Sequence, residues 1–177
     1  MTDQELISSI RIVPDFPVAG IQFFDVTTLF KDPAAFDEVV NRICAFYKDK
    51  GITKVAGIES RGFIAGAAVA SRLGAGFIPV RKPGKLPAET ISESYGKEYG
   101  TDTLEIHSDA IGPDDVVLIH DDILATGGTI AAAVRLVKRL GARAVYANFI
   151  IDITDVPRSE AVPGDVEVSA LLRLSEK

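Results

Sequence analysis

The middle of the chain alternates between short apolar runs and longer segments with a helical apolar repeat. The runs have the length and composition of buried strands and lie at 54–58, 76–80, 116–119 and 144–151. The helical repeats lie before or between these runs, at 36–47, 63–73 and 130–140. Strands that alternate with helices form a parallel sheet with helices on both faces. The sequence therefore predicts an α/β fold with an open, mostly parallel sheet flanked by helices.

A chain of 177 residues fits one domain, which we expect to span 1–177. The alternation predicts a core at about 34–154. The chain ends, about 1–33 and 155–177, leave the alternation, and we expect them to form a small hood over one end of the sheet. The polar stretch at about 82–103 has no helical apolar face. Such a long stretch in a small domain is usually functional or disordered, and we expect a mobile lid loop here.

The segment after the third apolar run carries the strongest chemical signal. Asp121 and Asp122 follow the run, and Ala-Thr-Gly-Gly-Thr at 125–129 leads into a helix. Ligands of open parallel sheets bind at the carboxyl ends of the strands, and a helix N-terminus attracts anions. Gly127 and Gly128 allow the backbone close to a phosphate, and the two threonines add hydroxyl donors. The two carboxylates suit sugar hydroxyls or a Mg²⁺ shell.

Spacing alone leaves a plainer interpretation open, in which the two acids are a solvated strand end and the turn merely caps a helix. Other phosphate motifs are missing, because the sequence has no G-x-x-x-x-G-K-[ST] segment. Gly74-Ala75-Gly76 continues to Pro79 rather than to glycine, so the dinucleotide fingerprint fails too.

The net charge of −6 argues against general nucleic-acid binding. A small anion remains possible, because Arg81-Lys-Pro-Gly-Lys85 concentrates three cations without an acid. No apolar run approaches the ~18 residues of a membrane span, and the acidic N-terminus is unlike a signal peptide. The single cysteine, Cys44, excludes an internal disulfide and a cysteine metal cluster within one chain, and a cytoplasmic location fits best.

An apolar strand followed by Asp-Asp and Ala-Thr-Gly-Gly-Thr resembles the phosphoribosyl pyrophosphate (PRPP) motif of the type I phosphoribosyltransferases. Further segments, in chain order, are similar to the adenine branch of that family. They are Asp15–Thr27, Glu59–Phe63, Arg81–Pro87 and Glu98–Gly100. The resemblance implies the type I phosphoribosyltransferase fold and transfer of the phosphoribosyl group of PRPP to adenine, which yields AMP and pyrophosphate in purine salvage. It also implies Mg²⁺ as cofactor and a homodimer, with no nucleic-acid or membrane partner.

The resemblance also assigns roles. Asp121 and Asp122 would face the ribose hydroxyls and help to place Mg²⁺ indirectly, with PRPP. Glu98 would exchange a proton with the base, and Arg61 and Lys85 would also be catalytic. The residues that would hold the 5-phosphate are Ala125, Thr126, Gly127, Gly128 and Thr129. Those on the pyrophosphate side are Ser60, Arg61, Arg81, Lys82 and Lys85, while Tyr99 would move with Glu98 on the lid. Phe23 would stack on adenine, and the backbones of Gln22 and Phe24 would read its edge.

Pattern alone favours a plainer reading of several of these residues. Phe23 belongs to an aromatic pair typical of a core, and Arg81–Lys85 could be a solvated turn. Glu98 is one of several acids in a polar stretch, and His120 reads as a hydrogen-bonded structural histidine.

The chain also departs from the family pattern. Phe24 stands where many relatives carry a basic residue, and Ala19 replaces a usual proline. Fine specificity is therefore open, and hypoxanthine, guanine or xanthine is an alternative base. A non-catalytic PRPP-binding regulator is a further alternative, although this acidic chain has no room for a DNA-binding module.

Overall fold

The computed structural model describes residues 1–96 and 100–177. Its main sheet, within these residues, contains five parallel strands in the order β4-β3-β7-β8-β9. The strands are β3 (Lys54–Ile58), β4 (Gly76–Val80), β7 (Val116–Leu124), β8 (Ala144–Ile153) and β9 (Glu167–Leu174). The open parallel sheet predicted from the sequence is confirmed, and Pro79 does not prevent its segment from forming the edge strand β4.

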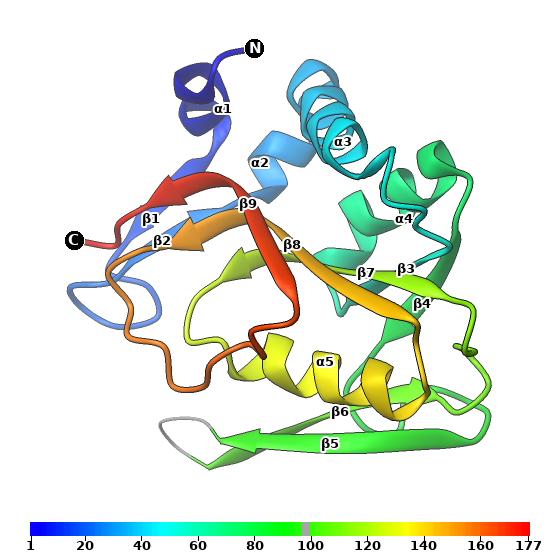
Figure 1. Cartoon of the computed structure of the whole chain (residues 1–177). Coiled ribbons are helices and arrows are strands. Elements are labelled where there is room, and N and C mark those ends of the chain that lie inside the picture. Colours follow the sequence, from blue (N-terminus) through cyan, green and yellow to red (C-terminus); the bar gives the residue numbers. More distant parts are fainter. Residues whose placement is uncertain (97–99) are drawn as a thin grey trace.

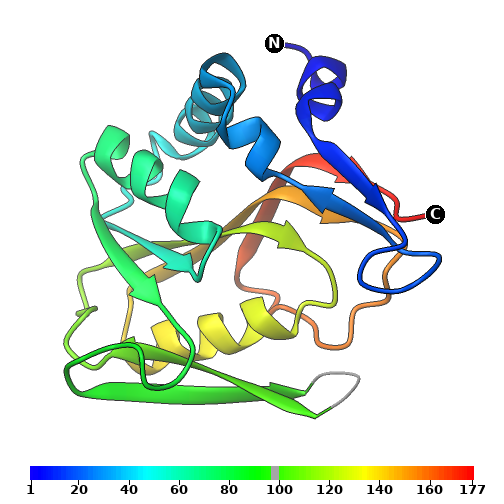
Figure 2. The same cartoon turned by 180° about the vertical axis from the view of Figure 1, so that it is seen from behind.

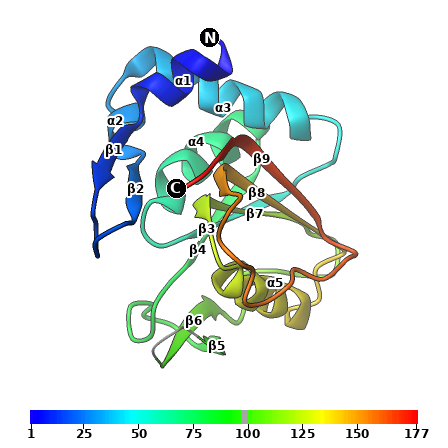
Figure 3. The same cartoon turned by 90° about the vertical axis from the view of Figure 1, so that its left-hand side faces the viewer.

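Helices cover both faces of the sheet (Figure 1 and Figure 3). One face packs against α3 (Pro33–Tyr47) and α4 (Gly62–Leu73), and the other packs against α5 (Gly128–Arg139). Successive residues of β7 divide between the two layers, since Leu118 belongs to the core under α3 and α4 while Val117 and Ile119 belong to the core under α5. This alternation follows from the period of two in a β-strand.

Each covering helix begins and ends where local chemistry allows it. Asp32 caps α3, because its Oδ1 accepts hydrogen bonds of 2.9 Å from the amides of Ala34 and Ala35. The stop of α4 is Gly74, whose φ of 70° suits glycine. Gly141, with φ of 90°, follows the end of α5 in the same way.

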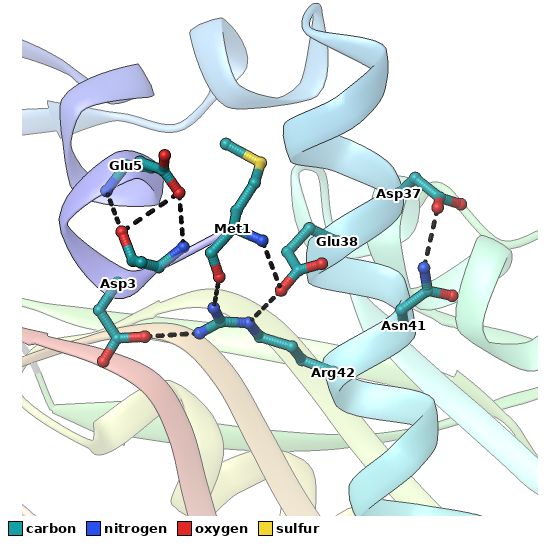
Figure 4. Close-up of polar contacts among 8 residues, drawn as sticks. Met1, Asp3, Glu5, Asp37, Glu38, Asn41 and Arg42 are labelled. Carbon is teal, nitrogen blue, oxygen red and sulfur yellow. Dashed lines mark hydrogen bonds and ion pairs between the residues drawn. The ribbon is translucent and has the colours of Figure 1, made fainter.

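The N-terminal segment lies outside the main sheet (Figure 2). It contains α1 (Asp3–Ser9), the antiparallel strands β1 (Arg11–Pro14) and β2 (Gln22–Asp25), and α2 (Thr27–Phe30). Arg42 of α3 holds α1 in place, as Figure 4 shows. Its Nη1 donates to Asp3 Oδ1 at 2.6 Å, and its Nε donates to Glu38 Oε1 at 2.8 Å. No described helix has the length and apolar character that a membrane crossing requires.

Three segments differ from the sequence-based expectation. Much of the polar stretch forms an antiparallel hairpin of β5 (Thr90–Gly96) and β6 (Thr101–His107), because its buried apolar side chains pack against α5. The acids Asp121 and Asp122 do not follow a finished strand, since β7 continues to Leu124 and pairs with β8 on both sides of them. The C-terminal segment was expected to leave the alternation, yet β9 extends the main sheet beside β8.

Candidate active site

Several of the predicted site residues, among them Arg61, Asp121 and Asp122, lie at the topological switch point of the sheet. The chain runs outward in opposite directions from β3 and β7, which are neighbours in the sheet. Ligands of open α/β sheets bind in the crevice beyond the carboxyl ends of two such strands. Arg61 follows β3, and its Nε donates to Oδ2 of Asp122 in β7. The structure therefore joins two predicted site segments that lie about sixty residues apart, as their numbers show.

The two acids of β7 are neighbours in the strand, and Asp122 is buried while Asp121 is partly exposed. Asp122 is only 3% exposed, and its amide donates to Asp121 Oδ1 at 2.9 Å. Burial, together with the neighbouring Asp122 carboxylate, raises the pKa of Asp121 well above its ordinary value. Burial opposes the charge of Arg61, but Asp122 and then Asp121 raise the pKa of its guanidinium. The pair thus favours a cation, and Arg61 supplies one.

The close approach of α4 to these acids depends on a glycine. A Cβ added to Gly62 would lie 2.7 Å from the His120 carbonyl oxygen and 3.1 Å from Asp121 Oδ1. A side chain at this position would therefore push the start of α4, and Arg61 with it, away from β7.

The loop between β7 and α5 encloses a small cavity of about 90 Å³ at the start of the helix. Its lining includes Asp121 and four residues of the predicted phosphate loop: Ala125, Thr126, Gly127 and Thr129. The first amides of α5 lack partners within the helix, and the helix dipole favours an anion at this end. The cavity has the chemistry of a phosphate site.

Three consecutive residues after β8, Arg158 to Glu160, brace this loop from outside. Arg158 donates to the Ala125 carbonyl, and the Ser159 amide donates to the Thr126 carbonyl at 2.8 Å. Gly127 has φ of 91°, and a Cβ there would lie 2.6 Å from the Glu160 carbonyl oxygen. The brace therefore fixes the loop residue by residue, and it requires glycine at position 127.

A larger cavity of about 260 Å³ adjoins the phosphate cavity. The two share Asp121, Ile123 and Ala125, and the larger one is also lined by Phe23 and Arg61. The Arg61 guanidinium lies 5.9 Å from the centre of the Phe23 ring. A sugar phosphate can thus extend from the small cavity into a space that carries an aromatic face.

The other base-binding candidates are placed differently. The side chain of Phe24 is 5% exposed and belongs to the core under α3 and α4, although the residue also lines the larger cavity. Gln22 is exposed at the start of β2. This leaves the backbones of both residues as the groups that could read a base.

Arg81 and Lys85 pair with Glu59 and are absent from the lining of the two cavities, which includes Arg61. Glu59 Oε2 accepts from Lys85 Nζ at 2.8 Å, while Oε1 accepts from the Lys82 amide at 2.6 Å and lies 3.3 Å from Arg81 Nε. Burial alone would raise the pKa of Glu59, but Lys85 and the Lys82 amide lower it overall. Ser60 is exposed beside this cluster. Glu98 and Tyr99 lie outside the described residues.

His120 lies at the end of a chain of buried polar side chains. Its Nδ1 lies 3.2 Å from Asn148 Oδ1, and Asn148 Nδ2 donates to Ser169 Oγ at 2.8 Å. Ser169 Oγ in turn lies 2.8 Å from the Tyr47 hydroxyl. Burial lowers the pKa of His120 to about 4, so the imidazole is neutral at physiological pH. The contacts agree with the structural role that the sequence favours for His120.

Sequence reasoning missed several residues near the cavities. Glu176 lines the larger cavity, and burial followed by the Asp155 carboxylate raises its pKa. The Arg158–Glu160 brace carries no recognisable motif. Tyr95 contacts the phosphate loop, but its segment, Ile-Ser-Glu-Ser-Tyr, has too few apolar residues to show the alternation of a strand.

Comparison with known proteins identifies the family of the chain. The family model of the phosphoribosyl transferase domain matches residues 25–165. The adenine phosphoribosyltransferase of Bacteroides thetaiotaomicron is 61% identical over 174 residues, which cover 98% of this chain and 99% of that protein.

Solved structures of two adenine phosphoribosyltransferases are similar to this chain over nearly their whole length. The crystal structure of adenine phosphoribosyltransferase from Rhodothermus marinus has a TM-score of 0.90 and 49% identity, and it covers 97% of both chains. The Giardia lamblia enzyme, solved with 9-deazaadenine, has a TM-score of 0.91 and 41% identity over 98% of both chains. The chain therefore belongs to the adenine phosphoribosyltransferases of the type I phosphoribosyltransferase family.

Proposed function

We propose that the site transfers the phosphoribosyl group of PRPP to adenine, which gives AMP and pyrophosphate. The observation that supports this most strongly is the pair of adjoining cavities. One lies at a helix N-terminus and suits a phosphate, and the other carries the Phe23 ring. They share Asp121, which lies where the ribose between phosphate and base would be.

The 5-phosphate would bind the amides of Ala125, Thr126, Gly127, Gly128 and Thr129 together with the hydroxyl of Thr126. The ribose hydroxyls would contact Asp121 and Asp122. A phosphate monoester is stabilised there by unpartnered amides and by the helix dipole. The brace at Arg158–Glu160 holds the loop carbonyls, which keeps the amides directed toward the small cavity.

The acids of β7 fit a metal ion that arrives with the substrate. No described group of three or more His, Cys, Asp or Glu side chains could hold a metal alone. Mg²⁺ is commonly bound by one or two carboxylates together with substrate phosphates, and Asp121 and Asp122 supply such a pair. When bound, Mg²⁺ would neutralise charge that develops on the pyrophosphate group.

The pyrophosphate would be held by Ser60, Arg61, Arg81, Lys82 and Lys85. Arg61 lies at the larger cavity, whereas Arg81 and Lys85 are paired with Glu59. These cations would stabilise the leaving charge as the bond to the sugar breaks. The segment at about 82–103 would act as the lid that keeps water from the positively charged sugar.

Adenine would stack on Phe23, with its edge read by the backbones of Gln22 and Phe24. The 9-deazaadenine bound to the Giardia lamblia enzyme supports a purine in this family. Glu98 would exchange a proton with the base. We expect Glu98→Ala to lower kcat by about 10²–10⁴-fold and to leave PRPP binding intact, because general acid–base help has this size.

The test is to incubate the protein with PRPP and Mg²⁺ and with adenine, hypoxanthine, guanine or xanthine separately, and to measure the nucleotide formed. AMP formed from adenine, with little product from the other bases, is the expected result. Product mainly from an oxopurine would transfer the proposal to that base. Binding of PRPP without any product would favour the non-catalytic regulator.

The proposal also covers the domain organisation, the cellular location and the oligomeric state. We treat residues 1–177 as one phosphoribosyltransferase domain with a core, a hood and a lid, and we place the reaction in the cytoplasm, where Cys44 stays reduced. We also propose a homodimer. The exposed apolar side chains of Phe46 on α3 and Ile64 on α4 support a pairing surface. Light scattering of the purified protein would return the mass of one chain if this is wrong.

A further inference from the structure

Tyr95 is a buried tyrosine of β5 that lies between the phosphate loop and the cationic segment. Its hydroxyl accepts hydrogen bonds from Thr129 Oγ1 at 3.2 Å and from Lys82 Nζ at 3.4 Å. It donates to Asp102 Oδ2 at 3.2 Å, and Asp102 lies opposite Tyr95 in the hairpin. A phenol has one proton and two lone pairs, so these three contacts use its full hydrogen-bonding capacity.

The ring of Tyr95 fixes a second residue of the same loop. A Cβ added to Gly128 would lie 2.9 Å from Tyr95 Cδ2. The ring therefore occupies the space beside the first residue of α5, while the hydroxyl holds the next residue, Thr129. Tyr95 and the Arg158–Glu160 brace together contact each of the five loop residues at 125–129.

The two residues that donate hydrogen bonds to this hydroxyl are proposed to bind opposite ends of the substrate. Thr129 is proposed to hold the 5-phosphate, and Lys82 is proposed to face the pyrophosphate. Lys82 is also paired with Asp102, and although burial disfavours its charge, Asp102 and Tyr95 raise its pKa overall. The Tyr95 hydroxyl thus joins the two phosphate-binding regions through one atom.

We propose that Tyr95 is a positioning residue whose hydroxyl fixes Thr129 and Lys82 relative to each other, so that the two ends of PRPP are bound cooperatively. The proposal rests on the proposed function, because it takes the two ends of the site from it. Tyr95 need not touch the substrate, since it acts through the orientation of groups that do.

The first test is Tyr95→Phe, which removes the hydroxyl and keeps the ring on Gly128. Calorimetry with PRPP and Mg²⁺, together with steady-state kinetics, should show a roughly tenfold weaker affinity and a KM for PRPP raised to match, as expected when binding interactions are lost. The KM for adenine and the melting temperature should stay close to the parent values. The matched control is Tyr146→Phe, which removes a hydroxyl from the start of β8 and should change neither constant.

The second test measures cooperativity directly with a double-mutant cycle on PRPP affinity. Thr129→Val and Lys82→Gln remove the two donors to Tyr95. In the parent chain the double variant should lose several-fold less affinity than the product of the two single losses. In the Tyr95→Phe background the two losses should multiply to within about twofold. A residue that only supports the fold would not move this coupling.

Either of two results would overturn the proposal: unchanged PRPP affinity in Tyr95→Phe, or independent losses for Thr129→Val and Lys82→Gln in the parent chain. The second result does not require Tyr95→Phe to fold. Failure of the proposed function appears differently, because the parent protein would then form no AMP from adenine and PRPP.

Discussion

The proposed phosphate-binding and base-binding ends of the site are built in opposite ways. The loop at 125–129 lies between a central strand and a helix, and its carbonyls accept hydrogen bonds from the Arg158–Glu160 brace. The base end depends on β1 and β2, which pair with each other outside the main sheet. Ile12, Phe16 and Val18 of this hairpin are about half exposed, at 49%, 50% and 60%.

This difference implies that the loop at 125–129 is preformed, whereas the β1–β2 hairpin becomes fully ordered only when a base binds. The phosphate loop needs little reorganisation, so the affinity for PRPP is not reduced by an ordering cost there. A two-stranded ribbon is marginally stable on its own, and contact with a base should order it further. We therefore expect changes at the phosphate end to have the larger effects.

The strongest challenge to this comparison is to neutralise the acids at the phosphate end. Asp121→Asn with Asp122→Asn should lower kcat/KM for PRPP by about 10²–10³-fold, because the pair that is proposed to face the ribose and to help place Mg²⁺ loses its carboxylates. The matched control is Asp109→Asn with Asp114→Asn, which neutralises two exposed carboxylates and should leave the rate unchanged. Equal rates in both double variants would remove the acids from the site.

Two glycines with similar backbone angles compare the ends directly. Gly127 has φ of 91° and no room for a Cβ, whereas Gly20, beside β2, has φ of 88° and open space around it. Gly20→Ala should destabilise the fold by about 1 kcal/mol through backbone strain alone. Gly127→Ala should cost about 2–3 kcal/mol and also weaken PRPP binding, because the loop must move away from Glu160. Urea unfolding measures the loss of stability in each variant, and calorimetry with PRPP measures the affinity. Equal losses of stability in the two variants would show that the brace is not rigid.

The phosphate end should also respond to acid through His120. The pKa of this buried imidazole is about 4 when folded, against an ordinary value of 6.5. The unfolded chain therefore binds the extra proton between these values, so this contribution to stability is present above pH 6.5 and is lost as the pH falls toward 4. Between pH 7 and pH 5 the loss should be about 2 kcal/mol.

The control for this prediction is His120→Gln, which has no titrating ring. Urea unfolding at pH 7 and pH 5 should show that the variant loses less stability than the parent, and the difference should equal the about 2 kcal/mol assigned to His120. If parent and variant lose stability in parallel, the imidazole is not held neutral in the folded protein.

The smallest effect is expected at the base end. Phe23→Ala should raise the KM for adenine about tenfold, because stacking of a base on an aromatic ring is worth about 1–3 kcal/mol. The KM for PRPP should change little. Val18→Ala, on the exposed turn of the same hairpin, is the control. A large loss of PRPP affinity in Phe23→Ala would mean that the two ends are not separable.

The sequence was most informative where one kind of periodicity dominates a segment. The apolar patterns of helix α5 and of strands β3 and β8 predict these elements, and Gly74 and Gly141 mark two helix ends. The hairpin of β5 and β6 escaped prediction, because its exposed faces carry many polar residues and its apolar positions are few. The strand β9 was missed because it joins the sheet without a preceding helix.

For the site, the sequence predicted which residues gather at the end of β7 better than it predicted what holds them. Asp122 and Arg61 meet as expected of one site, because Arg61 follows β3 and Asp122 lies near the carboxyl end of its parallel neighbour β7. The contacts of Arg158 with Ala125 and of Tyr95 with Thr129 join distant segments and involve common residue types. Long-range contacts of this kind leave no local pattern to read.

The brace also has a consequence for the order in which the enzyme matures during synthesis. A nascent chain that has emerged as far as Ile153 already contains every residue of the phosphate loop, but it lacks the backbone groups of Ser159 and Glu160 that hold the loop in shape. Domains generally fold as units. The proposed pocket for the sugar phosphate therefore cannot be completed before the chain beyond β8 has been made, and chains released at Ile153 would carry the loop sequence without the contacts that shape it.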